Sequence, residues 1–285
     1  MYKKIINFTI FSIIIYIFYL SFKNYQVLAA SLIDTSIMFI KNVFPFLYIT
    51  ILLNGLLIDL NLPFYFQKIF RNKYIYIFFM SILSGTPTSS IIIEKYLQKN
   101  DISEKDASLL LTFTAFNTPL FLYYYLNKIF IDKIIILKII LIIYISNILL
   151  FLFYYKKLSK NISQTIKYNR INITESLINN IKASINSIIY IYATILFFKM
   201  MSDLLISPTS ILRGFIEITQ GLNALSISNY NLKIKELLAL VILSFGGLSI
   251  HIQICNVLKK YNINYKYFYL SRLFYILVSF IVIII

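Results

Sequence analysis

Long apolar runs separated by short polar segments dominate the pattern along the chain. A membrane-spanning helix needs about 20 mostly apolar residues. Seven runs approach or meet this length, and they cover residues 5–22, 43–60, 107–126, 134–154, 185–205, 237–257 and 267–285. The pattern therefore predicts an all-α polytopic membrane protein, with one transmembrane domain over residues 1–285 and about seven spanning helices.

Two further apolar stretches are interrupted by small, polar and helix-breaking residues. Residues 74–97 contain the segment Ser84-Gly85-Thr86-Pro87-Thr88-Ser89-Ser90, and residues 208–227 contain Pro208, Gly214, Glu217, Gln220 and Gly221. Glycine and proline break helices, and nearby hydroxyl groups can bond to the backbone groups that are set free. We expect both stretches to be re-entrant helical hairpins, which enter and leave the membrane on the same side.

Composition excludes several classes of protein. Apolar residues make up 59% of the chain and charged residues 13%, whereas soluble domains average about 45–50% apolar and about 25% charged. A disordered chain would show the opposite balance. The single cysteine, Cys255, rules out an internal disulfide and a multi-cysteine metal site. An enzyme is not expected, because no nucleophile, histidine and carboxylate are spaced as a catalytic group.

The net charge of +16 is explained by membrane topology rather than by nucleic-acid binding. The basic residues fall mainly in short loops beside apolar runs, where they set orientation. With a cytoplasmic N-terminus and two re-entrant hairpins, seventeen lie on the cytoplasmic side, several of them in loop 155–173, and seven on the other side. We expect residues 1–30 to be a retained anchor helix, because about 18 apolar residues are long for a signal peptide.

The segments 31–154 and 174–285 carry related motifs in the same order. Ser31-Leu32-Ile33 returns as Ser176-Leu177-Ile178, and Asp59-Leu60 returns as Asp203-Leu204. A hairpin follows in each half, and then a helix interrupted by Asn117-Thr118-Pro119 or by Gly246-Gly247. The charge pattern gives the two halves opposite orientations. Chance similarity in an isoleucine-rich chain is the alternative, whereas an inverted repeat with paired broken helices indicates a secondary transporter.

The candidate substrate site lies near the middle of the membrane, between the two hairpins and the two interrupted helices. Helix N-termini at such interruptions present partial positive charge to anions, and exposed carbonyls can hold cations or water. The candidate substrate-binding residues are Ser84, Gly85, Thr86, Pro87, Thr88, Ser89, Asn117, Thr118, Arg213, Glu217, Thr219, Gln220, Gly221, Gly246, Gly247, Ser249, His251 and Gln253. We expect no metal and no cofactor, while the coupling ion, H⁺ or Na⁺, and the oligomeric state stay open. The expected partners are the lipid bilayer and a small anionic solute.

Several charged residues allow two interpretations. Glu217 lies in an apolar segment, where a carboxylate is costly, so it either couples a proton or cation or pairs with Arg213 four residues earlier. Arg213 either binds a dicarboxylate or extends to the lipid headgroups. His251, the single histidine, either titrates with the solute or packs within its helix. Lys199 and Asp203, four residues apart, are favoured as a structural ion pair.

At these interruptions the chain resembles a known family. The similarity is carried by Ser84-Gly85-Thr86-Pro87, by Asn117-Thr118-Pro119-Leu120-Phe121, and by residues 214–221 and 245–253, and it covers roughly residues 40–280. These motifs are similar to the YlbJ family of sporulation integral membrane proteins (also called SpoVV), within the nucleoside-recognition or "gate" domain group. That group is distantly similar to the concentrative nucleoside transporters, whose fold has two inverted repeats, each with a re-entrant hairpin.

The resemblance implies a function in bacterial spore formation. It implies transport of dipicolinic acid, a small dicarboxylate, from the mother cell across the outer forespore membrane. A nucleoside or other neutral-solute transporter stays open, although the glutamine and glutamate of the corresponding hairpin in the nucleoside transporters are absent here, and Thr86 and Thr88 lie in that stretch. A non-transporting scaffold for spore-envelope assembly also stays open, and it predicts that Gly85, Pro87 and Gly246 tolerate bulky substitution.

Overall fold

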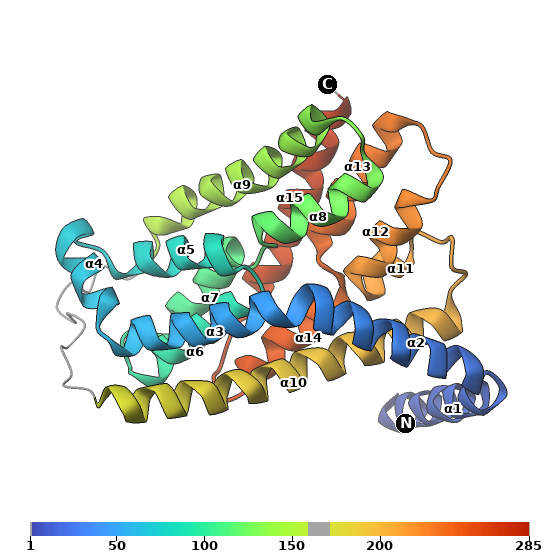
Figure 1. Ribbon diagram of the computed structural model, residues 1–285, viewed down its shortest axis with the longest axis horizontal. Helices are drawn as coiled ribbons and strands as arrows, with labels where there is room; N and C mark the ends of the chain where they lie inside the picture. Colours follow the sequence, from blue (N-terminus) through green and yellow to red (C-terminus); the bar gives the residue numbers. More distant parts are fainter. Residues whose placement is uncertain (1, 159–171, 285) are drawn as a thin grey trace.

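The computed structural model describes residues 2–158 and 172–284, and within these ranges every regular element is helical (Figure 1). Among the described residues, seven helical segments are long and apolar enough to cross a membrane: Ile6–Lys23, Tyr25–Asp59, Glu104–Ile129, Lys133–Tyr155, Ile173–Leu205, Leu232–Val257 and Lys266–Ile283. Each contains most or all of one apolar run of the sequence. The prediction of an all-α chain with about seven apolar spans is therefore confirmed.

A near-continuous helical rod follows the N-terminal helix α1 (Tyr2–Lys23). It consists of α2 (Tyr25–Met38), one π-helical turn η1 (Phe39–Val43) and α3 (Phe44–Asp59). Pro45 lies in the first turn of α3, and the π-helical turn comes directly before that helix. The boundary predicted between residues 30 and 31 falls inside α2.

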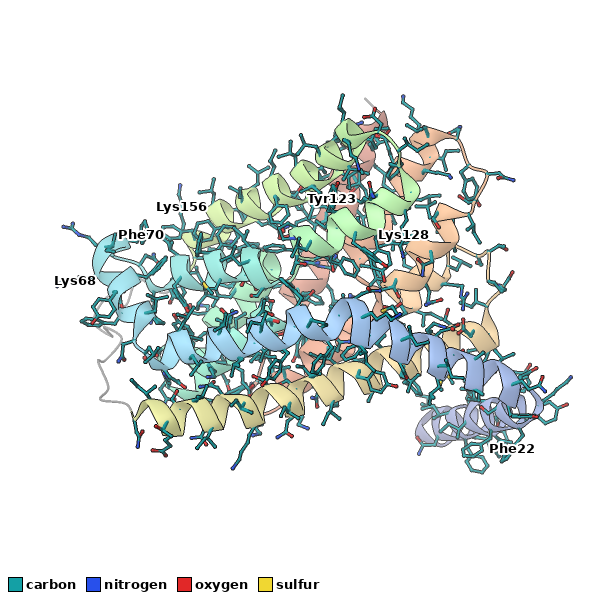
Figure 2. All side chains as sticks on the ribbon, viewed as in Figure 1. Phe22, Lys68, Phe70, Tyr123, Lys128 and Lys156 are labelled. Atoms are coloured by element: carbon teal, nitrogen blue, oxygen red, sulfur yellow. The ribbon has the colours of Figure 1, made fainter. Side chains whose placement is uncertain are left out.

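A short amphipathic helix, α4 (Leu62–Phe70), turns the chain at the end of α3. Asn61, the residue before it, takes a left-handed conformation with φ 61°. Ile69 and Phe70 of α4 are exposed. Figure 2 shows Lys68 and Phe70 toward the same end of the molecule as Lys156, at the end of α9.

The first half continues with two interrupted helical units. α5 (Lys73–Ser84) and α6 (Thr88–Gln98) form a hairpin whose turn is Gly85-Thr86-Pro87. α7 (Glu104–Thr114) and α8 (Pro119–Ile129) are separated by residues 115–118, and α9 (Lys133–Tyr155) follows. The helix breaks coincide with the two proline-containing segments that the sequence analysis singled out, because proline cannot continue a helix from the preceding turn.

The second half begins with the longest helix, α10 (Ile173–Leu205). It is followed by α11 (Arg213–Ile216), α12 (Ile218–Ser226), α13 (Leu232–Phe245), α14 (Gly247–Val257) and α15 (Lys266–Ile284). α10 starts well before the apolar run at 185–205. Its first part is polar. Ser176 and Asn180 are buried there, and both donate hydrogen bonds to the carboxylate of Asp59 in α3.

The second hairpin differs from its prediction in extent. Within residues 208–227 the structure is helical only in α11 and α12, and α11 is a single turn of 4 residues. Pro208 precedes this turn, in a stretch of irregular backbone between α10 and α11. Most of the predicted loop 155–173 lies outside the described residues.

The two halves meet along a pair of antiparallel helical rods. The rod α2–η1–α3 runs beside α10 in the opposite direction (Figure 1), and Ile51 of α3 packs with Ile188 and Ile191 of α10. The α5–α6 hairpin approaches the centre from one end of the molecule and the α11–α12 hairpin from the other (Figure 1). Both hairpin turns therefore reach the middle of the molecule, where the helix breaks of α7–α8 and α13–α14 also lie.

Candidate functional site

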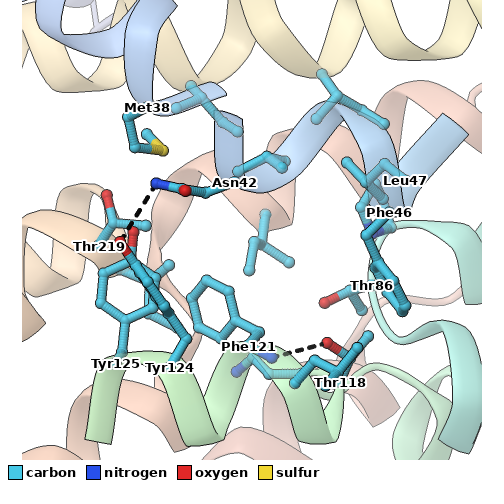
Figure 3. Close-up of a pocket in the computed structure, with 18 of the residues that line it drawn as sticks. Met38, Asn42, Phe46, Leu47, Thr86, Thr118, Phe121, Tyr124, Tyr125 and Thr219 are labelled. Carbon is cyan, nitrogen blue, oxygen red and sulfur yellow. Dashed lines mark hydrogen bonds between the residues drawn. The ribbon is translucent and has the colours of Figure 1, made fainter. Parts of the chain in front are cut away.

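A cavity of about 660 Å³ lies where the hairpin turns and helix breaks meet (Figure 3). Its walls come from both halves: α2, η1, α3, α8 and the α5–α6 turn on one side, and α10, α12 and α14 on the other. Cavities of this size hold small organic ligands. The cavity occupies the position that the sequence analysis expects for a substrate site.

Half of the predicted site residues line this cavity. They are Ser84, Thr86, Pro87, Asn117, Thr118, Glu217, Thr219, Ser249 and Gln253. Seven more belong to the same turns and breaks without lining it, namely Gly85, Thr88, Ser89, Gln220, Gly221, Gly246 and Gly247. The remaining two, Arg213 and His251, have other partners, described below. The structure thus brings residues from four separate segments of the sequence to one cavity.

The first hairpin turn docks on the break between α7 and α8. The backbone N–H of Thr86 donates to the carbonyl of Phe116 at 2.9 Å. Gly85 has φ +59°, and a Cβ atom on it would lie 2.6 Å from Thr118 Cγ2. Thr118 in turn caps α8, accepting from the backbone N–H of Phe121 at 3.2 Å. Glycine is required at position 85 both by its conformation and by the space available.

Glu217 forms the turn of the second hairpin. It ends α11 and caps α12, where its carboxylate accepts from the backbone N–H of Gln220 at 3.1 Å and from the hydroxyl of Thr219. Its residue surface is 1% exposed, yet it lines the cavity. A buried carboxylate at a helix N-terminus is stabilised by the helix dipole. The two arms pack closely, because a Cβ on Gly221 would lie 2.2 Å from the Cα of Gly214.

Three hydroxyl groups at the starts of α6 and α14 are buried and have no hydrogen-bond partner among the described residues. They belong to Thr88 and Ser89, in the first turn of α6, and to Ser249, in the first turn of α14. Ser249 lines the cavity and is 1% exposed. Buried polar groups are nearly always hydrogen-bonded. Ser249 therefore offers a free hydrogen-bonding group to a molecule in the cavity.

Arg213 does not pair with Glu217, the partner that its i, i+4 spacing suggests. The guanidinium instead forms an ion pair with Asp203, and its Nε donates to the hydroxyl of Ser202 at 2.8 Å. Lys199 binds the same carboxylate at 2.9 Å, which confirms the predicted structural ion pair. Arg213 does not line the cavity, so the structure gives no support to direct binding of a dicarboxylate by this residue.

His251 is packed on aromatic rings. Its Nε2 is 2.8 Å from the carbonyl oxygen of Phe245, and its ring centre is 4.8 Å from that of Phe245 and 5.1 Å from that of Phe268. The histidine lies behind the cavity and not in its wall. Of the two interpretations that the sequence allowed, the structure favours the packed residue.

One wall of the cavity was not predicted from the sequence. α8 contributes Phe121, Tyr124, Tyr125 and Lys128, and η1 contributes Asn42 (Figure 3). Asn42 Nδ2 donates to the hydroxyl of Tyr124 at 3.3 Å. The sequence does contain a signal for this wall, because positions 121, 124, 125 and 128 recur at intervals of three and four residues directly after the break at Pro119 and so share one face of a helix. In an apolar helix that period also marks lipid-facing or core residues, so it did not single out a site.

The cavity wall is mostly apolar and uncharged, and its aromatic side chains come from α3 and α8. Lys128 and Glu217 are its charged residues, and amide and hydroxyl groups of Asn42, Asn117, Thr118 and Gln253 supply further hydrogen-bonding capacity. Within the described ranges no three histidine, cysteine, aspartate or glutamate residues are grouped as metal ligands. The arrangement suits reversible binding of a small, partly polar organic molecule.

No family model, no curated protein and no solved structure matches this chain. The family resemblance seen in the sequence motifs, and the function that it implies, therefore stay predictions. The cavity and its surroundings are the basis for a functional proposal.

Proposed function

We propose that this protein is a secondary transporter that moves a small organic anion through the central cavity, with dipicolinic acid as the leading candidate. The observation that carries the proposal is the cavity itself, built from two hairpin turns and two helix breaks. Irregular backbone at membrane depth is tolerated where it is buried in protein or lines a water-filled cavity. Transporters place their solute sites at such discontinuous helices.

An inverted repeat is part of this proposal, and reciprocal contacts support it. Ser31 donates to the carboxylate of Asp203, and Ser176, its counterpart in the second half, donates to that of Asp59 at 2.9 Å. The serine of each half contacts the aspartate of the other half, and such reciprocal contacts are expected from a two-fold axis between the halves. The repeated serine and aspartate motifs thus meet each other in space.

The grouping of loops supports the proposed topology. Asn72 donates to the hydroxyl of Tyr155 at 2.7 Å, and the backbone N–H of Asn262 donates to Glu104 at 3.0 Å. Lys73, at the start of α5, donates to the carbonyl of Asp101, between α6 and α7, and so joins these two pairs. The turns that follow α4, α6, α9 and α14, all assigned to the cytoplasm by their lysines, therefore lie at one end. Re-entrant hairpins from opposite sides, with these turns in the cytoplasm, agree with the positive-inside rule. A cytoplasmic N-terminus rests on the sequence alone, because α1 lies beside the start of α2, at the other end of the molecule from these turns (Figure 1).

The chemistry of the cavity favours a planar organic solute carried with a proton. Aromatic side chains of α8 can stack on a ring. Glu217 is the buried carboxylate in the wall, and in its charged form it would repel a dianion. Protonation of Glu217 removes that repulsion, so we favour H⁺ as the coupling ion. The proposal that transport takes place at the outer forespore membrane during sporulation rests on the sequence resemblance alone.

Flux measurements test this proposal. Proteoliposomes bearing the purified protein should take up labelled dipicolinate with saturation, and an inward proton gradient should accelerate the uptake. Absence of saturable flux, together with normal dipicolinate in spores of a strain lacking the protein, would refute the proposal.

A nucleoside or other neutral solute is the second candidate. The specific observation in its favour is that Arg213, the strongest anion-binding candidate of the sequence, is neutralised by Asp203 away from the cavity. Competition distinguishes the two: saturable uridine uptake that dipicolinate does not inhibit would favour the neutral solute.

A further inference from the structure

Lys128 lies in the last turn of α8, on the helical face that lines the cavity (Figure 2). We call Phe121, Tyr124, Tyr125 and Lys128 the α8 face. The ammonium group of Lys128 is 4.3 Å from the ring centre of Tyr124 and 5.2 Å from that of Tyr125. Cation–π attraction holds the charge over these rings, at the outer part of the cavity wall.

Three other cations in this part of the molecule are paired with carboxylates. Arg213 and Lys199 share the carboxylate of Asp203, and Lys138 binds Glu236 at 2.8 Å. Lys128 forms no ion pair with a described residue. Because it lines the cavity, it is the positive charge available there to a solute carboxylate.

The spacing along the α8 face allows a ring and a carboxylate to be bound together. Seven residues separate Phe121 from Lys128, which corresponds to about 10 Å along a helix. A planar aromatic acid fits within that length, with its ring against Tyr124 and its carboxylate at Lys128. The inner end of such a molecule points toward Thr118, at the start of α8.

We propose that the α8 face is an outer subsite that recognises aromatic carboxylates, in which Lys128 binds the carboxylate and the tyrosine rings contact the ring of the solute. This inference rests on the proposed transport function and adds to it the residues that select the class of solute. It gives the anion-binding role to Lys128 instead of Arg213.

The test compares dipicolinate uptake by the wild type and by Lys128→Met, Lys128→Arg and Lys133→Met. Lys133 is the matched control, because it lies near Lys128 and donates to the Tyr123 hydroxyl at 3.3 Å without lining the cavity. Loss of one charge-assisted hydrogen bond should raise the half-saturating dipicolinate concentration about tenfold in Lys128→Met, with the maximal rate unchanged. Lys128→Arg and Lys133→Met should stay close to the wild type.

Three outcomes separate this inference from the transport proposal. Wild-type half-saturation in Lys128→Met, or an equal rise in Lys133→Met, overturns the α8 subsite and leaves transport standing. A fall in maximal rate with lower thermal stability, and no change in half-saturation, shows a structural role and also overturns it. Absence of saturable flux in the wild type overturns the transport proposal, and the subsite falls with it.

Discussion

At the scale of single residues, Glu217 is the side chain on which the proposed coupling depends. Glu217→Gln keeps the size of the side chain and an oxygen that can cap α12, but it removes the titrating group. We expect dipicolinate uptake to fall at least about tenfold at its pH optimum and to lose its dependence on the proton gradient. Uptake measured between pH 5 and pH 8 checks this.

Glu175→Gln is the matched control for Glu217→Gln, because Glu175 is exposed near the start of α10. It should leave both the rate and its pH dependence unchanged. An unaltered pH profile in Glu217→Gln would remove this carboxylate from the transport mechanism.

Asp203 is the residue whose loss should most weaken the fold around the second hairpin. Its carboxylate balances both Lys199 and Arg213, whose side chains are 11% and 7% exposed. Removing one partner of a buried ion pair costs about 3–5 kcal/mol, so Asp203→Asn should clearly lower the thermal unfolding temperature in detergent. Asp132→Asn should be nearly neutral, since asparagine caps a helix as well as aspartate does. Equal unfolding temperatures for the two variants would contradict the ion-pair assignment.

The sequence predicted some of these residue contacts and not others. The Lys199–Asp203 pair follows from i, i+4 spacing on a helix, which is local information. The partner of Arg213 could not be predicted, because Glu217 and Asp203 are both near in sequence. Which of the two carboxylates pairs with Arg213 depends on the short α11, which turns the guanidinium back toward α10. The role proposed for Lys128 could not be predicted, because the sequence places this residue among many basic residues assigned to topology.

At the scale of helical elements, the docking of the first hairpin turn gives a matched pair of glycine substitutions. Gly85 and Gly246 both have positive φ, at +59° and +86°. A Cβ on Gly85 would collide with Thr118, whereas nothing lies within 4 Å of a Cβ on Gly246. Gly85→Ala should therefore reduce stability and flux more than Gly246→Ala, whose cost is the backbone strain of about 1–3 kcal/mol.

Thermal unfolding and dipicolinate uptake of the two alanine variants check this order. A non-transporting scaffold predicts that both positions tolerate substitution. Full stability of Gly85→Ala would contradict the docked turn, and the scaffold would be favoured only if neither the wild type nor the variant showed flux.

Helix breaks were the elements that sequence reasoning located best. Gly85 and Pro87, Pro119, and the pair Gly246-Gly247 each fall within one to three residues of an observed break, because these residue types restrict the backbone locally. The length of α10 and the shortness of α11 were not predictable from apolar runs. They depend on contacts with α3 and α14, which are distant in sequence.

At the scale of the whole molecule, the proposed inverted repeat predicts on which side each loop lies. The experiment uses Cys255→Ser, which removes the single native cysteine. Ile131→Cys, at a position that is 98% exposed between α8 and α9, should react with an impermeant thiol reagent added outside intact cells. Lys259→Cys, exposed beyond the end of α14, should react only after permeabilisation. Labelling of both positions from one side would contradict the inverted topology.

The central claim is that the cavity between the two halves binds the transported solute. Thr86→Cys in the Cys255→Ser background places one thiol at the first hairpin turn, in the cavity wall. The measurement is the rate at which this thiol is modified, with and without dipicolinate, while uptake is followed. The account predicts that dipicolinate slows modification and that modification stops uptake. Equal modification rates with and without dipicolinate, and uptake that survives modification, would contradict it.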